Sequence, residues 1–126
     1  MKIKIVIWSP QKNYSIYADA ETGEFTFGLE TKTEGVQTFV RQAIQIVKEW
    51  PDRVEDLNVS DGISYKIAYE DESGARQIVG SNKTPETFPA LMYLIERNRP
   101  NNRAFLAKEE IRKREILNTM ISLEMK

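Results

Sequence analysis

The 126-residue sequence contains no cysteine and no histidine. Without cysteine there are no disulfides, no thiolate nucleophiles and no zinc or iron–sulfur sites built on thiolates. Without histidine the chain lacks the commonest general base and the commonest transition-metal ligand. Catalysis would depend on carboxylates, Lys, Tyr or Ser/Thr, and these residues form no recognisable nucleophile–base pair or metal constellation. The sequence therefore predicts no catalytic residue, no metal site and no cofactor, and it favours a protein that is not an enzyme.

Long apolar runs are also missing. The apolar N-terminal segment is interrupted by Lys4, and residues 9–13 end it without the small residues of a signal-peptide cleavage site. No other run approaches the length of a membrane span. These features predict a cytoplasmic protein that does not associate with membranes.

The composition is that of an ordinary globular domain, with 40% apolar and 29% charged residues. A chain of this length buries roughly two-thirds of its unfolded surface, so we expect one domain over residues 1–126. The net charge is −1, but the charge is unevenly distributed. Residues 1–96 carry 10 basic and 15 acidic side chains, whereas residues 97–126 carry 8 basic and 4 acidic ones.

Alternation of apolar and polar residues predicts five strands. Three of them form a meander at the start of the chain, and in the third Phe25, Phe27 and Leu29 alternate with Glu24, Thr26 and Glu30. Residues 63–69 and 76–79 form a later hairpin. The expected sheet is antiparallel or mixed.

Two helices follow from apolar stripes with a period near 3.6 residues. The first is expected to start at the N-cap Thr33 and to stop at Pro51. The second is expected to start at Thr84–Pro85, although Pro89 makes its first turn irregular or moves its start further along. A third helix is expected from about Arg103 towards the C-terminus, where it could project from the domain. The predicted fold is α+β in the order βββ-α-ββ-α-α, with the helices on one face of the sheet.

Both periodicities converge on one set of residues that should form a contiguous core. These residues are Ile5, Ile7, Phe25, Phe27, Phe39, Val40, Ile44, Val47, Tyr65, Ile67, Phe88, Leu91 and Ile95.

A patterned hairpin, a Gly-x-Asn loop and a Pro-started helix follow one another over about residues 61–95. The residues that define them are Asp61, Gly62, Tyr65, Ile67, Tyr69, Glu70, Asp71, Gly74, Gly80, Ser81, Asn82, Pro85 and Phe88. In these residues the chain resembles small bacterial α+β proteins that have no assigned activity. The resemblance implies the same fold class and no particular chemistry.

One candidate site is the loop before the second helix, made of Gly80, Ser81, Asn82, Lys83 and Thr84. A loop that enters a helix N-terminus exposes backbone N–H groups that can hold an anion. Ordinary turn and capping chemistry explains the same residues and is the commoner reason for them.

A second candidate is the basic segment over residues 97–114, which could contact phosphates of a nucleic acid. Its basic residues in this role are Arg97, Arg99, Arg103, Arg112, Lys113 and Arg114. Glu109 and Glu110 stand four residues before Lys113 and Arg114, so a helix with paired, solvated charges explains part of the pattern.

Aromatic residues recur on the predicted strands, at Trp8, Tyr14, Tyr17, Tyr65 and Tyr69. They could line a pocket or stack on nucleic-acid bases, but aromatic residues are generally favoured on half-buried sheet faces.

The last candidate is an apolar stripe that follows the charged segment. It consists of Ile116, Leu117, Met120 and Ile121. Such a stripe needs cover, either from a second copy of the chain or from its own core.

The sequence thus favours a protein-interaction module that self-associates as a homodimer or a larger oligomer, with room for another protein partner. Nucleic-acid binding at residues 97–114 is the first alternative, and binding of a small anion or metabolite at residues 80–84 is the second.

Overall fold

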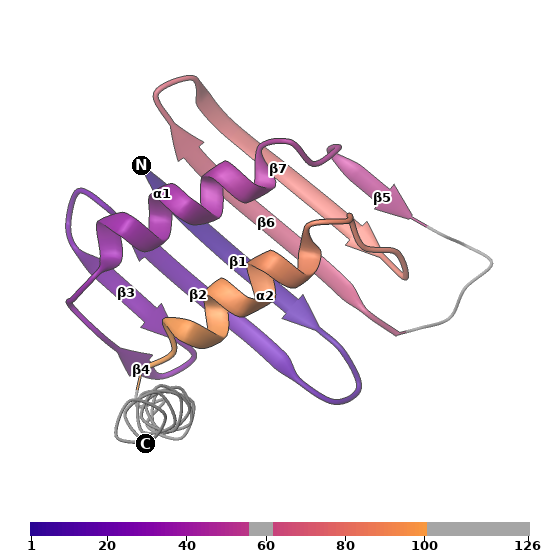
Figure 1. Ribbon diagram of the computed structural model, residues 1–126, viewed down its shortest axis with the longest axis horizontal. Helices are drawn as coiled ribbons and strands as arrows, with labels where there is room; N and C mark the ends of the chain where they lie inside the picture. Colours follow the sequence, from indigo (N-terminus) through magenta and orange to yellow (C-terminus); the bar gives the residue numbers. More distant parts are fainter. Residues whose placement is uncertain (56–61, 101–126) are drawn as a thin grey trace, which may run out of the picture.

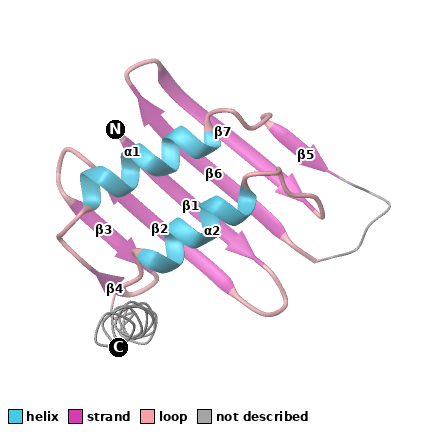
Figure 2. Cartoon of the chain, in the orientation of Figure 1, coloured by secondary structure: helices cyan, strands magenta, loops and turns pink. Residues whose placement is uncertain are grey.

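The computed structural model describes residues 1–55 and 62–100, which form an α+β fold. Within these residues a seven-stranded sheet carries two helices (Figures 1 and 2). The elements are β1 (Lys2–Trp8), β2 (Asn13–Asp19), β3 (Glu24–Phe27), β4 (Glu30–Thr31), α1 (Val36–Val47), β5 (Arg53–Glu55), β6 (Ser64–Asp71), β7 (Gly74–Ser81) and α2 (Phe88–Arg97). The strand order across the sheet is β4-β3-β2-β1-β6-β7-β5. All neighbours are antiparallel except β5 and β7, so the sheet is mixed.

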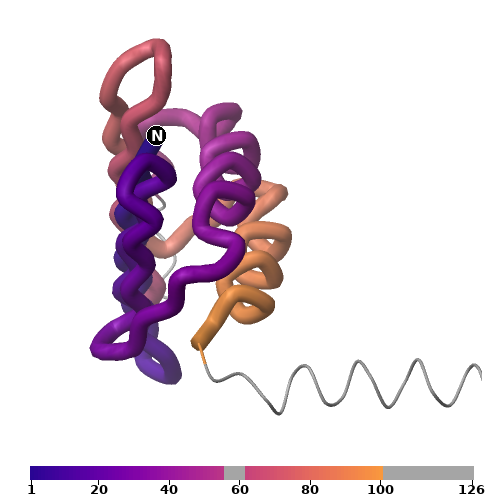
Figure 3. The backbone as a smooth tube through the Cα atoms, turned by 90° about the vertical axis from the view of Figure 1, so that its left-hand side faces the viewer, coloured from indigo at the N-terminus to yellow at the C-terminus, as the bar shows by residue number. Residues whose placement is uncertain are grey.

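Strand β1 is the centre of the sheet and pairs with β2 on one side and β6 on the other. Ile5 lies opposite Ile16 of β2 and Ile67 of β6, and all three side chains are buried. Because side chains alternate along a strand, this register directs a row of apolar residues to one face. Helices α1 and α2 pack on that face (Figure 3).

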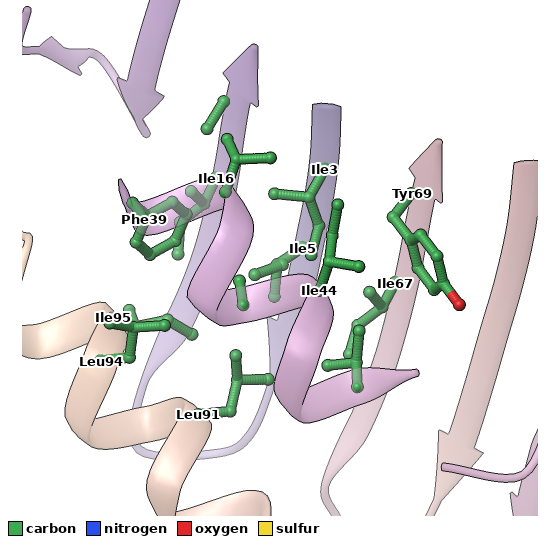
Figure 4. Packing of buried hydrophobic residues seen from close by; sticks show 14 of the residues in the cluster. Ile3, Ile5, Ile16, Phe39, Ile44, Ile67, Tyr69, Leu91, Leu94 and Ile95 are labelled. Atoms are coloured by element: carbon green, nitrogen blue, oxygen red, sulfur yellow. The ribbon is translucent and has the colours of Figure 1, made fainter. Parts of the chain in front are cut away.

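The core lies between the sheet and the two helices (Figure 4). Phe39 of α1 and Leu91 and Ile95 of α2 are almost completely buried against the sheet. Every residue that the two periodicities assigned to the core is buried, so this prediction is confirmed. Neither helix in the described part of the chain is long and apolar enough to span a membrane.

The predicted number of strands was wrong, because the sheet has seven strands rather than five. The edge strands β4 and β5 are two and three residues long, too short to show alternation. The third predicted strand also ends early. Gly28 takes φ +61, which a residue with a Cβ rarely adopts, and turns the chain so that Leu29 does not continue β3 and is fully exposed.

The predicted helix boundaries also need correction. The N-cap of α1 is Gly35 rather than Thr33, and the helix ends at Val47, before Pro51. Helix α2 starts at Phe88, so Thr84 does not cap it. The proline inside its first turn moved the start along the chain, which was the second of the two expected effects. The third predicted helix lies outside the described residues.

Candidate functional site

One face of the sheet is covered by α1 and α2, and no described residue covers the other face (Figure 3). We call this second surface the open face. On its four longest strands it consists of Lys2, Lys4, Val6 and Trp8 of β1, Asn13, Ser15, Tyr17 and Asp19 of β2, Ser64, Lys66, Ala68 and Glu70 of β6, and Ala75, Gln77, Val79 and Ser81 of β7.

Two large apolar side chains of the central strand remain in water on the open face. Trp8 is 52% exposed and Val6 is 37% exposed. The residues directly opposite Trp8 are Asn13 and Ser64, so no apolar cross-strand neighbour shields the indole. A single exposed apolar residue is ordinary, but two in succession on the central strand form a patch that calls for a reason.

Charge is distributed unevenly along the strands of the open face. At the N-terminal end of β1, Lys2 pairs with Glu70 at 3.6 Å, and Asp19 and Glu24 continue the same row across β2 and β3. That end is therefore acidic.

The middle of the open face is basic. Lys4 and Lys66 have no ion-pair partner among the described residues, and no carboxylate lies directly opposite either of them. Arg53 of β5 lies in the same row as Lys66, across Val79 at the sheet edge, and 3.7 Å from Glu55. We call Lys4, Lys66 and Arg53 the basic band.

A shallow hollow lies beside the basic band. Ala68 and Ala75 have short side chains, and the space between Lys4, Tyr17 and Gln77 measures about 380 Å³. Loss of solvent around the Tyr17 hydroxyl and the charge of Asp19 both raise the pKa of Tyr17, so this phenol is neutral at physiological pH.

The predicted anion loop is arranged differently from the expectation. Gly80 and Ser81 belong to β7, and the start of α2 at Phe88 is separated from the loop by several residues. Asn82 has a left-handed backbone with φ 61, and its Oδ1 accepts a hydrogen bond of 3.2 Å from the Gly62 N–H. The loop therefore closes the β7 end of the sheet and does not present the N-terminus of α2.

Gly80 has a packing role that the sequence did not reveal. It lies opposite Tyr65 on the covered face, and the Tyr65 ring passes directly over it. A Cβ at this position would lie 2.0 Å from Cζ of that ring. This close approach explains why the position is a glycine.

The predicted basic segment is only partly described. Arg97 is exposed at the end of α2, while Arg99 lies over the Phe27 ring at 5.2 Å and within 3.8 Å of Glu96. Arg99 thus contributes to the packing of its own domain. The other basic residues of this candidate, Arg103, Arg112, Lys113 and Arg114, lie outside the described residues, as do Ile116, Leu117, Met120 and Ile121.

Among the described residues no group of three or more carboxylates is placed to hold a metal ion.

The sequence also contained a signal for the open face that was not used. Lys4, Val6 and Trp8 alternate with the buried isoleucines of β1.

Comparison of the chain with protein-family models, with curated proteins and with solved structures finds no match, so no relative assigns a ligand to this face.

Proposed function

We propose that this protein is a non-enzymatic interaction module that binds another macromolecule across the open face. The observation that carries the proposal is the half-exposed Trp8 on the central strand, next to Val6 on an uncovered sheet. A partner that covered both side chains would remove their apolar surface from water, at about 25 cal/mol per Å².

The fold itself gives no reason for this pair. Trp8 lies between Asn13 and Ser64, and Val6 lies between Ser15 and Lys66, so neither has an apolar residue directly opposite. Cross-strand pairs of apolar residues are what normally reward an aromatic residue on a sheet surface. An aromatic side chain without such a partner is typical of a binding surface, where tryptophan is enriched.

Site-specific photo-crosslinking in cells of the source organism tests the proposal. Benzoylphenylalanine replaces Trp8 in one variant and Tyr93 in the other. Tyr93 is a matched control because it is an aromatic residue with 50% exposure on α2, in the helix layer. We expect a discrete crosslinked macromolecule from position 8 and none from position 93. Equal crosslinking at both positions, or none at position 8, contradicts the proposal.

Self-association through Ile116, Leu117, Met120 and Ile121 is a separate proposal that rests on the sequence, as does the cytoplasmic location. Self-association through these residues is compatible with an open face that binds another macromolecule, because the two proposals use different parts of the chain.

A further inference from the structure

We infer that the macromolecule bound at the open face is a single-stranded nucleic acid, held by the basic band and by the rings of Trp8 and Tyr17. This inference rests on the function proposed above and specifies the partner.

Charge is the first reason. Lys4 lies opposite Tyr17 and Ala68, and Lys66 lies opposite Val6 and Val79, so both ammonium groups stand among uncharged neighbours. Each is free to contact an anion without breaking an ion pair with a described residue. A chain of phosphates has the complementary charge.

The two rings are the second reason. Trp8 lies four residues along β1 from Lys4, about 13 Å at roughly 3.3 Å per residue. Tyr17 lies directly opposite Lys4 on β2. Lys4 thus stands beside Tyr17, and Lys66, opposite Val6, lies at a level between Lys4 and Trp8 along the strands. Rings beside cations are the combination used to bind unpaired strands, because rings stack on bases while cations hold the backbone. In a duplex the flat faces of the bases are already stacked, so a duplex cannot use these rings.

The hollow and the acidic end define where the strand runs. The space beside Tyr17, floored by Ala68, has a volume of about 380 Å³ and can accept a base next to the phenol ring. Lys2 and Glu70 line the far side of this space, and Asp19 and Glu24 continue their row across β2 and β3, so the carboxylates there would repel phosphates. The strand is thus expected to extend from Trp8 past Lys66 and Lys4 to the hollow and to end there.

Binding of a dye-labelled oligothymidylate to the full chain, followed by fluorescence anisotropy at several salt concentrations, tests this assignment. Three phosphate contacts predict a slope of log K against log salt of about −2, because each contact on a single strand contributes about −0.7. The double variant Lys4→Gln with Lys66→Gln should reduce the slope to about −0.7. Its matched control is Arg41→Gln with Lys48→Gln, which makes the same change in net charge in the helix layer and should leave the slope unchanged.

Stacking is tested by Trp8→Leu, which should weaken binding by roughly 5- to 150-fold, whereas Tyr93→Leu should leave it unchanged. Thermal melting of each variant confirms that all of them are folded. No binding at low salt, duplex bound as tightly as single strand, or equal slopes for the two double variants would overturn the inference. Equal slopes would mean that the nucleic acid binds at another basic segment of the chain.

The crosslinking experiment separates this inference from the function on which it depends. A nuclease-sensitive adduct at position 8 supports both. An adduct that resists nuclease and is digested by protease would show that the partner is a protein. That result supports the proposed interaction module and overturns the inference of a nucleic-acid ligand. Absence of any adduct at position 8 overturns the proposed function itself.

Discussion

Three aromatic rings meet where β6, the end of the α1–β5 connection and the start of α2 come together. Tyr65 lies 5.9 Å from Trp50 and 5.5 Å from Phe88, measured between ring centroids. The Trp50 Nε1–H donates a hydrogen bond of 2.6 Å to Thr87 Oγ1, which satisfies the polar atom of a buried indole. The Tyr65 ring reaches this position only because Gly80, on the neighbouring strand, has no side chain.

Gly80→Ala should therefore be strongly destabilising. The new methyl group would overlap the Tyr65 ring, and overpacking of this kind typically costs about 1–3 kcal/mol or more. Chemical denaturation of the variant should show this loss in the free energy of unfolding. In the double variant Tyr65→Leu with Gly80→Ala, the cost of the alanine should largely disappear, because the ring is gone. An alanine that costs the same with and without the ring would show that the overlap is not its cause.

A second residue-scale feature joins β2 to the end of α2. The Tyr14 hydroxyl donates a hydrogen bond of 2.5 Å to Glu96 Oε1, and the Tyr14 ring packs edge-on against Phe27. Burial, followed by the hydrogen bond and the charge of Glu96, raises the pKa of Tyr14 from 10.0 to about 12. The folded state therefore holds the phenol proton more tightly than the unfolded state does.

This shift predicts an alkaline loss of stability with a defined pH window. The contribution of Tyr14 is fully present below pH 10, the pKa of the unfolded state, and is lost as pH rises through about 12. At 1.36 kcal/mol per pKa unit, the loss amounts to about 3 kcal/mol. Urea denaturation between pH 9 and pH 12 measures it, and Tyr14→Phe is the control because it cannot titrate. The prediction fails if the two proteins lose stability in parallel over this range.

At the scale of the elements, Arg76 of β7 connects the sheet to the segment between α1 and β5. Its Nε donates to Asp52 Oδ1 at 2.7 Å, its Nη1 to the Lys48 carbonyl at 2.9 Å, and its Nη2 to the Trp50 carbonyl. One planar guanidinium thus binds three points of a connection that contains no regular structure. It fixes the direction from which the chain enters β5.

Arg76→Lys should destabilise the protein by about 1–3 kcal/mol, because one ammonium group cannot replace three hydrogen bonds in a fixed fork. Hydrogen exchange should rise first at residues 48–55, which the fork holds. Asp52→Asn is the matched comparison and should have little effect, because the Asp52 side chain is 76% exposed and the two carbonyl contacts remain. Protection of residues 48–55 equal to that of the wild type would show that the fork does not hold the connection.

Regular elements of four or more residues in the described part of the chain could be predicted from the sequence, whereas the strands of two and three residues could not. The isoleucines of β1 and the stripe of α1 each repeat often enough to reveal a period, so the strands of the sheet centre and the core residues were predicted correctly. Strands β4 and β5 have no repeat, since pairing with β3 and β7 creates them. The end of β3 depends on the backbone angle of Gly28, and its sequence neighbour Leu29 continues the alternation misleadingly.

The candidate site could be predicted only in part. The limit here is the pairing of strands rather than the length of the elements. Alternation alone is enough to place Lys4, Val6 and Trp8 on one face of β1, although this signal was not used. Their significance depends on what lies opposite them, namely Ser15, Asn13 and Lys66, and on which face the helices cover. Those facts belong to strand order and register, which a single sequence does not encode locally.

At the scale of the whole molecule, the covered face and the open face have different tasks. The helix layer seals a continuous apolar core, and no buried polar side-chain atom among the described residues lacks a hydrogen-bond partner. The open face contributes little to that core and carries the unpaired charges and the exposed indole. Substitutions on the open face should therefore alter binding without altering the fold, which is what makes the proposed variants interpretable.

The remaining question at this scale is whether the chain associates with itself. The reason to expect self-association is a change from charged to apolar residues along the sequence. Between Lys108 and Glu115 only Ile111 is uncharged, whereas the stripe at Ile116, Leu117, Met120 and Ile121 is entirely apolar. Burial of four such side chains contributes on the order of 6–10 kcal/mol before ordering costs, at roughly 1.5–3 kcal/mol each. Exposed ion pairs in the charged stretch are typically worth under about 1 kcal/mol, so the stripe dominates.

We therefore predict that Leu117→Asp with Ile121→Asp converts an oligomer into a folded monomer. Two carboxylates in a dry interface between copies would be desolvated without partners, which costs more than the association provides. Light scattering should give the mass of an oligomer for the wild type and of a single chain for the variant, and circular dichroism should show the sheet unchanged. Lys108→Asp with Lys113→Asp is the control, since it places two new carboxylates on the charged stretch and should leave the mass unchanged. If the double variant at 117 and 121 unfolds, or if the wild type is already a monomer at high concentration, the stripe seals the core of its own chain and the prediction is wrong.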